Sequence, residues 1–126
     1  MDPKKVLVVD DSKLIHKMFE MMLRDLPLVH AFDGREALGS LSEHAEIDLI
    51  LLDINMPTMN GLEFLAEVKR NGAFAKIPIV IVSTQGKQED TDRAIEAGAN
   101  AYITKPFRSE DILRVIADLD PDPPRE

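Results

Sequence analysis

Two adjacent carboxylates, Asp10 and Asp11, follow directly on the apolar run Val6–Val9. Other apolar runs in the chain also end in reactive groups, namely Asp53, Ser83 with Thr84, and Lys105. In an open parallel sheet, ligands bind at the carboxyl ends of the strands. If these runs are neighbouring parallel strands, we expect their terminal side chains to meet in one crevice.

Three carboxylates in one crevice repel one another. At ~4 Å each pair costs roughly 1 kcal/mol in water and about 4 kcal/mol at an intermediate dielectric. Such a cluster requires a bound cation or the protonation of one of its members. The donor set of Asp10, Asp11 and Asp53 is all oxygen and contains no histidine, which suits Mg²⁺, with Mn²⁺ as the alternative, better than zinc. The pattern therefore predicts a divalent ion that also accepts the oxygens of a phosphate group.

The elements that must position these groups are short and apolar. Val6–Val9, Leu49–Leu52 and Ile79–Val82 are continuous rather than alternating, which is typical of strands buried on both faces of a parallel sheet. Leu28–Phe32 and Ala101–Thr104 are two weaker candidates for strands.

Helical patterns fall between the strands. After Ser12, which can act as an N-cap, an apolar stripe recurs at helical spacing as far as Leu23. The other predicted helices are Glu36–Leu41 after Asp33, Leu62–Val68 ending near Gly72, Asp90–Ala97 closed by Gly98, and Ile112–Ile116 begun by Ser109. Strand and helix thus alternate five times, and right-handed crossovers then favour an α/β fold with a doubly wound parallel sheet.

Composition narrows the range of functions. The chain has 126 residues, which suits one domain, and a formal net charge of −8 disfavours nonspecific binding to nucleic acid or to an anionic membrane. The absence of cysteine excludes disulfides and thiolate chemistry. No apolar run is long enough for a secretory signal or a membrane span, so we expect a soluble, cytoplasmic protein. Nucleotide-binding loops of the GxxxxGK and GxGxxG types, Ser-His-Asp patterns and HExxH motifs are all missing from the sequence.

Four segments, VLVVDDS, LLDINMPTMNG, PIVIVSTQG and AYITKPF, resemble the signature segments of bacterial response-regulator receiver domains, and single-domain CheY-like proteins most closely. The resemblance covers about residues 4–118 and leaves 119–126 as a disordered tail or linker. It implies a single flavodoxin-like (βα)5 domain with the strand order 2-1-3-4-5, for which CheY is a standard example.

The resemblance also implies roles for the acidic residues. Asp53 resembles the phosphoacceptor, whose carboxylate attacks the phosphorus of a phosphohistidine on a histidine kinase or phosphotransfer protein. Asp11 would bind Mg²⁺ directly and Asp10 through water. The main-chain carbonyl of Asn55 would be a further ligand, together with Asp53 itself.

The remaining motif residues would bind or sense the phosphoryl group. Ser83 matches the position whose hydroxyl bonds a phosphoryl oxygen, with the neighbouring Thr84 as a fallback. Lys105 would place its ammonium against the acyl phosphate, and the Lys105–Pro106 peptide would be cis. Tyr102 matches an aromatic residue that changes its exposure when the hydroxyl residue moves. Phosphorylation would then bias the face formed by the fourth helix, the fifth strand and the fifth helix, which a protein partner would read.

Two other functions stay open at this point. Phosphohydrolases of the haloacid dehalogenase type also use a strand-end Asp with Mg²⁺, but they place a second Asp where this chain has Asn55. A degenerate receiver would bind partners without phosphorylation. Purely structural roles are the alternative for several of these residues. Asp10 and Asp11 would then cap a helix, and Tyr102 would only pack against its neighbours. His16, His30 and His44 would be ordinary surface or packing residues.

Overall fold

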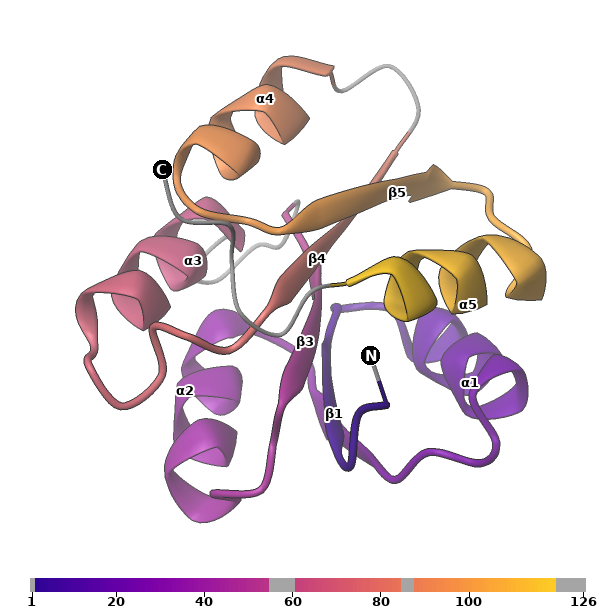
Figure 1. Cartoon of the computed structure of the whole chain (residues 1–126), viewed down its shortest axis with the longest axis horizontal. Helices are drawn as coiled ribbons and strands as arrows, with labels where there is room; N and C mark the ends of the chain where they lie inside the picture. Colours follow the sequence, from indigo (N-terminus) through magenta and orange to yellow (C-terminus); the bar gives the residue numbers. More distant parts are fainter. Residues whose placement is uncertain (1, 55–60, 85–87, 120–126) are drawn as a thin grey trace.

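The computed structural model describes residues 2–54, 61–84 and 88–119, and in this part of the chain strands and helices alternate (Figure 1). The elements are β1 (Val6–Val9), α1 (Lys13–Met22), β2 (Leu28–Ala31), α2 (Gly34–Glu43), β3 (Leu49–Asp53), α3 (Gly61–Arg70), β4 (Ile79–Thr84), α4 (Gln88–Glu96), β5 (Ala101–Lys105) and α5 (Ser109–Asp118). Among the described helices, none is long and apolar enough to cross a membrane.

The five strands form one parallel sheet in the order β2-β1-β3-β4-β5. β1 lies inside the sheet, where Val6–Val9 pairs with Leu28–Ala31 on one side and with Leu49–Leu52 on the other. Both the doubly wound α/β fold and the strand order expected from the sequence are confirmed. This order makes β1 and β3 neighbours, so the residues that follow them lie side by side.

Alternate residues of the central strands point to opposite faces of the sheet, and each face carries its own apolar core. Leu7, Ile50 and Ile81 pack on the side of α2 and α3, whereas Val8, Leu51 and Val82 pack on the side of α1 and α5. Figure 1 shows these two helical layers on either side of the sheet. The continuous apolar runs thus result from burial on both faces, as the sequence predicts.

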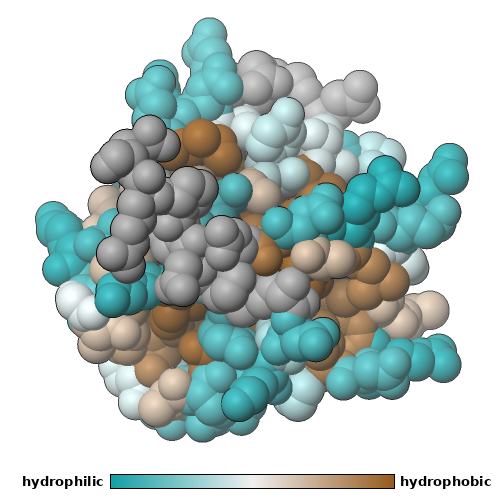
Figure 2. All heavy atoms as spheres, in the orientation of Figure 1, coloured by the Kyte–Doolittle hydropathy of each residue, from teal (hydrophilic) through white to brown (hydrophobic). Residues whose placement is uncertain are grey.

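The protein surface is less apolar than the two cores, but some large hydrophobic side chains are exposed on it. Figure 2 shows hydrophobic residues at the surface on the side where Figure 1 places α1 and α5. The large exposed hydrophobic side chains on these two helices are Leu14 and Met21 of α1 and Leu113 of α5.

Local signals place the helix ends. The Ser12 hydroxyl accepts a hydrogen bond from the main-chain N–H of Ile15 at 3.4 Å, and the Asp33 carboxylate accepts one from Glu36 at 2.8 Å. Gly98 has φ +116°, a conformation that suits glycine at the end of α4. The predicted caps are therefore confirmed.

Three strand ends differ from the sequence prediction in a way that matters for function. β3 extends to Asp53, β4 to Thr84 and β5 to Lys105, because the ladder pairs Asp53 with Val82, Ser83 with Thr104 and Thr84 with Lys105. The main-chain pairing of each apolar run therefore continues through the polar residues that end the strand. At the other end of the chain, Leu119 is the C-cap of α5 and is buried in the core, while 120–126 lie outside the described residues.

Gly61, the first residue of α3, lies against the end of β3. A Cβ atom at this position would lie 2.3 Å from the Cα atom of Ile54 and 2.6 Å from the main-chain oxygen of Asp53. Both are main-chain atoms that no side-chain rotation can move. Gly61 thus lets α3 begin directly beside the strand that carries Asp53.

We expect Gly61→Ala to lower the free energy of unfolding by about 1–3 kcal/mol, the usual cost of overpacking. Gly39, inside α2, is the matched control because nothing lies within 4 Å of its added Cβ. Gly39→Ala should raise stability by about 0.5–1 kcal/mol, since alanine loses less conformational entropy in a helix. Urea unfolding followed by circular dichroism measures both changes, and an unchanged midpoint for Gly61→Ala would contradict the steric argument.

Candidate functional site

Asp10, Asp11 and Asp53 come together at the carboxyl edge of the sheet. One carboxylate oxygen from each of the three lies within 4.8 Å of the others. Asp10 is 2% exposed and Asp53 is 4% exposed, whereas Asp11 is exposed to solvent. The acidic cluster expected from the sequence is therefore present, with two buried carboxylates and one that faces water.

Asp10 is fixed on several sides. Its Oδ1 accepts a hydrogen bond from the main-chain N–H of Ser12 at 2.9 Å, and its main-chain oxygen accepts one from His16 Nε2 at 2.7 Å. Its Oδ2 lies 3.3 Å from Lys105 Nζ. These contacts hold the turn between β1 and α1 and aim the Asp10 carboxylate at the cluster.

Lys105, the last residue of β5, brings a positive charge to the site. Its Nζ atom lies 3.3 Å from Asp10 Oδ2 and 3.8 Å from Asp53 Oδ2. The Lys105–Pro106 peptide bond is cis, as expected. Three carboxylates and one ammonium give −3 + 1 = −2 formal charges. The residues described here therefore leave an excess of negative charge that a divalent cation can neutralise.

The donor set fits a hard cation. The three grouped side chains all offer carboxylate oxygens, the ligand type that Mg²⁺ and Mn²⁺ prefer. His16 contacts the main-chain oxygen of Asp10 and is not one of the grouped side chains. Asn55, whose carbonyl was expected to be a further ligand, lies outside the described residues.

The hydroxyl residues of β4 differ in their surroundings. Ser83 is 2% exposed, and its Oγ lies 3.2 Å from Oγ1 of the buried Thr91 in α4. Thr84 is exposed, which favours Ser83 over Thr84 as the hydroxyl of the site. Tyr102, on β5, is 47% exposed and does not belong to the buried core.

Sequence reasoning missed three residues next to the site. Thr91, His16 and His30 have no motif of their own, and the two histidines were interpreted as ordinary surface or packing residues. His16 is buried, which that interpretation allows, but the sequence did not indicate its polar contacts: its Nε2 donates to the main-chain oxygen of Asp10, and its Nδ1 lies 2.6 Å from His30 Nδ1. The one available signal was that His16 falls on the apolar stripe of α1, where a polar ring needs partners.

Comparison with known proteins places this arrangement in a family. The model of the response regulator receiver domain matches residues 6–117. Chemotaxis protein CheY1 of Helicobacter pylori is 37% identical over 106 residues, which cover 82% of this chain and 86% of the relative.

Two solved structures extend the comparison. Chemotaxis protein CheY4 of Vibrio cholerae superimposes with a TM-score of 0.84 and 34% identity, over 92% of this chain and 98% of that chain. The Mn²⁺-bound form of response regulator Rcp1 superimposes with a TM-score of 0.75 and 32% identity, over 90% of this chain and 89% of that chain.

The acidic cluster predicts a stability that depends on divalent cations. We expect Mg²⁺ to raise the free energy of unfolding of the parent, by about 2.7 kcal/mol at one hundred times its dissociation constant. Asp11→Asn removes the exposed carboxylate and should lose most of this gain. In chelator the variant should be at least as stable as the parent, because one like charge is gone.

Thermal unfolding with Mg²⁺ and with chelator measures both effects. Asp25→Asn, which removes an exposed carboxylate from the loop after α1, is the matched control and should respond to Mg²⁺ like the parent. An equal Mg²⁺ response of Asp11→Asn and the parent would show that this cluster does not bind the ion.

Proposed function

The chain belongs to the response regulator receiver domain family, and from this premise we propose that it accepts a phosphoryl group on Asp53 from a histidine kinase or a phosphotransfer protein. The protein is a two-component response regulator, and its relatives do not favour a phosphohydrolase or a degenerate receiver. The observation that carries the proposal is the meeting of Asp10, Asp11, Asp53 and Lys105 at one edge of the sheet.

The proposed reaction is an in-line transfer. An Asp53 carboxylate oxygen forms a bond to phosphorus while the bond from phosphorus to the imidazole nitrogen of the donor breaks, and the imidazole leaves. Such transfers depend on positioning and charge stabilisation more than on covalent help from the protein. Asp53 is held at the end of a paired strand, and the Lys105 ammonium, 3.8 Å from it, offsets charge on the moving group.

The acidic residues would bind a divalent metal ion, which would complete the proposed site. Mg²⁺ or Mn²⁺, held by Asp10, Asp11, Asp53 and the main-chain carbonyl of Asn55, would supply further charge neutralisation. The receiver would thereby assist only its own phosphorylation and dephosphorylation, without turnover of an external substrate.

The phosphorylated residue would act on β4 and β5. An acyl phosphate adds roughly −1.5 to −2 charges. Its oxygens can accept hydrogen bonds from the Ser83 hydroxyl and the Lys105 ammonium. Because Ser83 now contacts Thr91 of α4, recruitment of Ser83 by the phosphoryl group would break or reshape that contact and shift α4 against the sheet.

The proposed output is the α4-β5-α5 face. β5 is an edge strand, and each of the three elements presents a large exposed hydrophobic side chain, namely Ile95, Tyr102 and Leu113. Exposed apolar groups of this kind on neighbouring elements suit a protein partner. We therefore propose that phosphorylation changes the affinity of this face for a protein partner. The receiver would span residues 4–118 and act in the cytoplasm.

We expect the parent to gain the mass of one phosphoryl group after incubation with Mg²⁺ and acetyl phosphate, and Asp53→Asn to gain none. Asp48→Asn makes the same chemical change near the other end of β3 and should be phosphorylated like the parent. Intact-protein mass spectrometry decides the matter, and equal mass gain in Asp53→Asn would refute the assignment of the phosphoacceptor.

Tyr102 offers a second test because the chain has one tyrosine and no tryptophan, so its fluorescence reports on a single ring. We expect quenching of Tyr102 by acrylamide to decrease when Mg²⁺ and beryllofluoride mimic phosphorylation, as the half-exposed ring becomes buried. Ser83→Ala should abolish most of this change. Thr84→Ala, at the exposed neighbouring position, should leave it intact, and a full response in Ser83→Ala would remove Ser83 from the switch.

A further inference from the structure

The two ends of α4 are attached to the rest of the domain in different ways. The first half of the helix meets the sheet through Thr91, whose Oγ1 lies 3.2 Å from Ser83 Oγ, near the strand ends that carry the acidic site. This is a contact between two hydroxyls, and a hydroxyl can change its hydrogen-bond partner by rotation of one side chain. The C-terminal end of the helix is instead held by main-chain hydrogen bonds.

α4 ends in a Schellman motif around Gly98. The Gly98 N–H donates to the Ile95 carbonyl at 3.1 Å. The Ala99 N–H donates to the Ala94 carbonyl at 3.0 Å, and the two bonds together define the motif. Ala94 and Ala99 are both buried in the core on the side of α2 and α3. The last turn of α4 is therefore fixed by its own hydrogen bonds and by packing.

Asn100, which follows this turn, ties it to the start of β4. Its main-chain N–H donates to the Ile79 carbonyl at 2.8 Å, and its Oδ1 accepts a hydrogen bond from the Ile79 N–H at 3.0 Å. Ile79 begins β4, whereas Ser83 lies near the end of the same strand. The reciprocal pair of Asn100 and Ile79 thus anchors α4 at the edge of the sheet opposite to the acidic site.

Lys69 of α3 covers the same turn. A Cβ atom on Gly98 would lie 3.2 Å from Cε and 3.4 Å from Cδ and Cγ of Lys69, so the lysine stem lies directly on this glycine. The Lys69 Nζ atom donates to the main-chain oxygen of Ala75 at 3.0 Å, and burial lowers the pKa of the ammonium. Figure 1 shows this end of α4 on the side of α3. Lys69 therefore links α3, the loop before β4 and the turn after α4.

We propose that phosphorylation of Asp53 tilts α4 about its C-terminal end, and that Asn100 and Lys69 are the positioning residues that hold this end in place. The inference rests on the proposed function, because the phosphoryl group must first draw Ser83 away from Thr91. A helix of nine residues is about 13 Å long, so a small rotation about its last turn becomes a larger displacement of its first turn.

The tilt acts unevenly on the exposed side of α4. Glu89, in the first turn, moves most, whereas Ile95, in the last turn, keeps its place beside the anchor. A partner on the α4-β5-α5 face thus meets the same apolar side chain in both states but a different arrangement of charges. The affinity of the partner therefore changes through the charged first turns of the helix.

The test measures how far each end of α4 moves, and it uses spin labels because the chain has no cysteine of its own. Glu89→Cys and Glu96→Cys place a label at either end of α4, and Glu43→Cys at the end of α2 is the reference; all three positions are exposed. Electron paramagnetic resonance gives the distance from the reference to each label, with and without Mg²⁺ and beryllofluoride. For rotation about one end, we expect the change at Glu89→Cys to be at least about twice that at Glu96→Cys.

The anchor residues are tested in the same labelled pairs. Asn100→Ala removes the acceptor for the Ile79 N–H, and Lys69→Ala removes the stem that lies on Gly98. In both variants we expect the two distances to change by similar amounts, because the fixed end is released. Asn100→Asp keeps an acceptor oxygen at this position and should restore the pattern of the parent.

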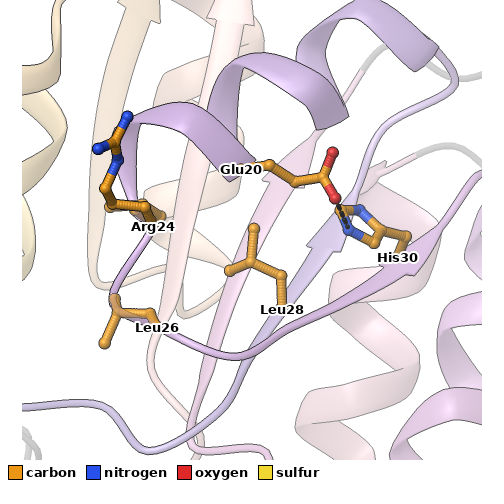
Figure 3. A pocket seen from close by; sticks show the side chains of 6 residues that line it. Glu20, Arg24, Leu26, Leu28 and His30 are labelled. Carbon is orange, nitrogen blue, oxygen red and sulfur yellow. Dashed lines mark ion pairs between the residues drawn. The ribbon is translucent and has the colours of Figure 1, made fainter.

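Two control variants remove polar side chains that do not touch the turn after α4. Arg70→Ala changes the exposed neighbour of Lys69, which pairs with Glu67. Glu20→Gln removes the ion pair between α1 and His30 of β2, 3.5 Å long and drawn as a dashed line in Figure 3. Both should show the same uneven movement of α4 as the parent.

Amide hydrogen exchange guards against variants that lose structure elsewhere. In the parent, the amides of Ile79 and Asn100 should exchange at the same rate with and without beryllofluoride. Asn100→Ala should speed exchange at Ile79 by about tenfold, the effect of one lost hydrogen bond, and leave β1 and β3 protected. Faster exchange of the Asn100 amide on activation of the parent, or equal movement of both ends of α4, would overturn the proposal.

Intact-protein mass spectrometry separates this inference from the proposed function. A parent that gains a phosphoryl group from acetyl phosphate, but whose two α4 labels move equally or not at all, would overturn the tilt and leave phosphorylation of Asp53 intact. A parent that gains no phosphoryl group would overturn both.

Discussion

The repulsion among three carboxylates at the ends of two adjacent strands is the constraint on which the rest of this structure depends. Asp10 and Asp53 are almost fully buried and lie with Asp11 in one cluster. Each pair of such charges costs about 4 kcal/mol at an intermediate dielectric. The fold offsets this cost with the Ser12 main-chain N–H and the Lys105 ammonium, and it leaves −2 formal charges for a divalent cation. The same imbalance that makes the cluster unfavourable without a cation thus suits it to a divalent ion.

The sheet order connects the acidic cluster to the proposed output face. With the order 2-1-3-4-5, β3, which carries the proposed phosphoacceptor Asp53, is separated from the edge strand β5 by β4 alone. The residues that can answer a new charge on Asp53 therefore sit on the two strands that lead outward, Ser83 on β4 and Lys105 on β5. Ser83 contacts Thr91 and so connects β4 to α4. In the proposed switch, a charge placed on Asp53 would therefore change the structure at the edge of the sheet.

The sequence predicted most of this framework because the framework is set by local patterns. Continuous apolar runs located the strands, and Ser12, Asp33 and Gly98 marked helix ends through contacts or backbone conformations within a few residues. The strand ends were placed too early, since ladder pairing continues through polar residues such as Asp53 that an apolar pattern cannot include. The partnership of His16 with His30 depends on how α1 packs across β2, and no spacing along the chain encodes that distance.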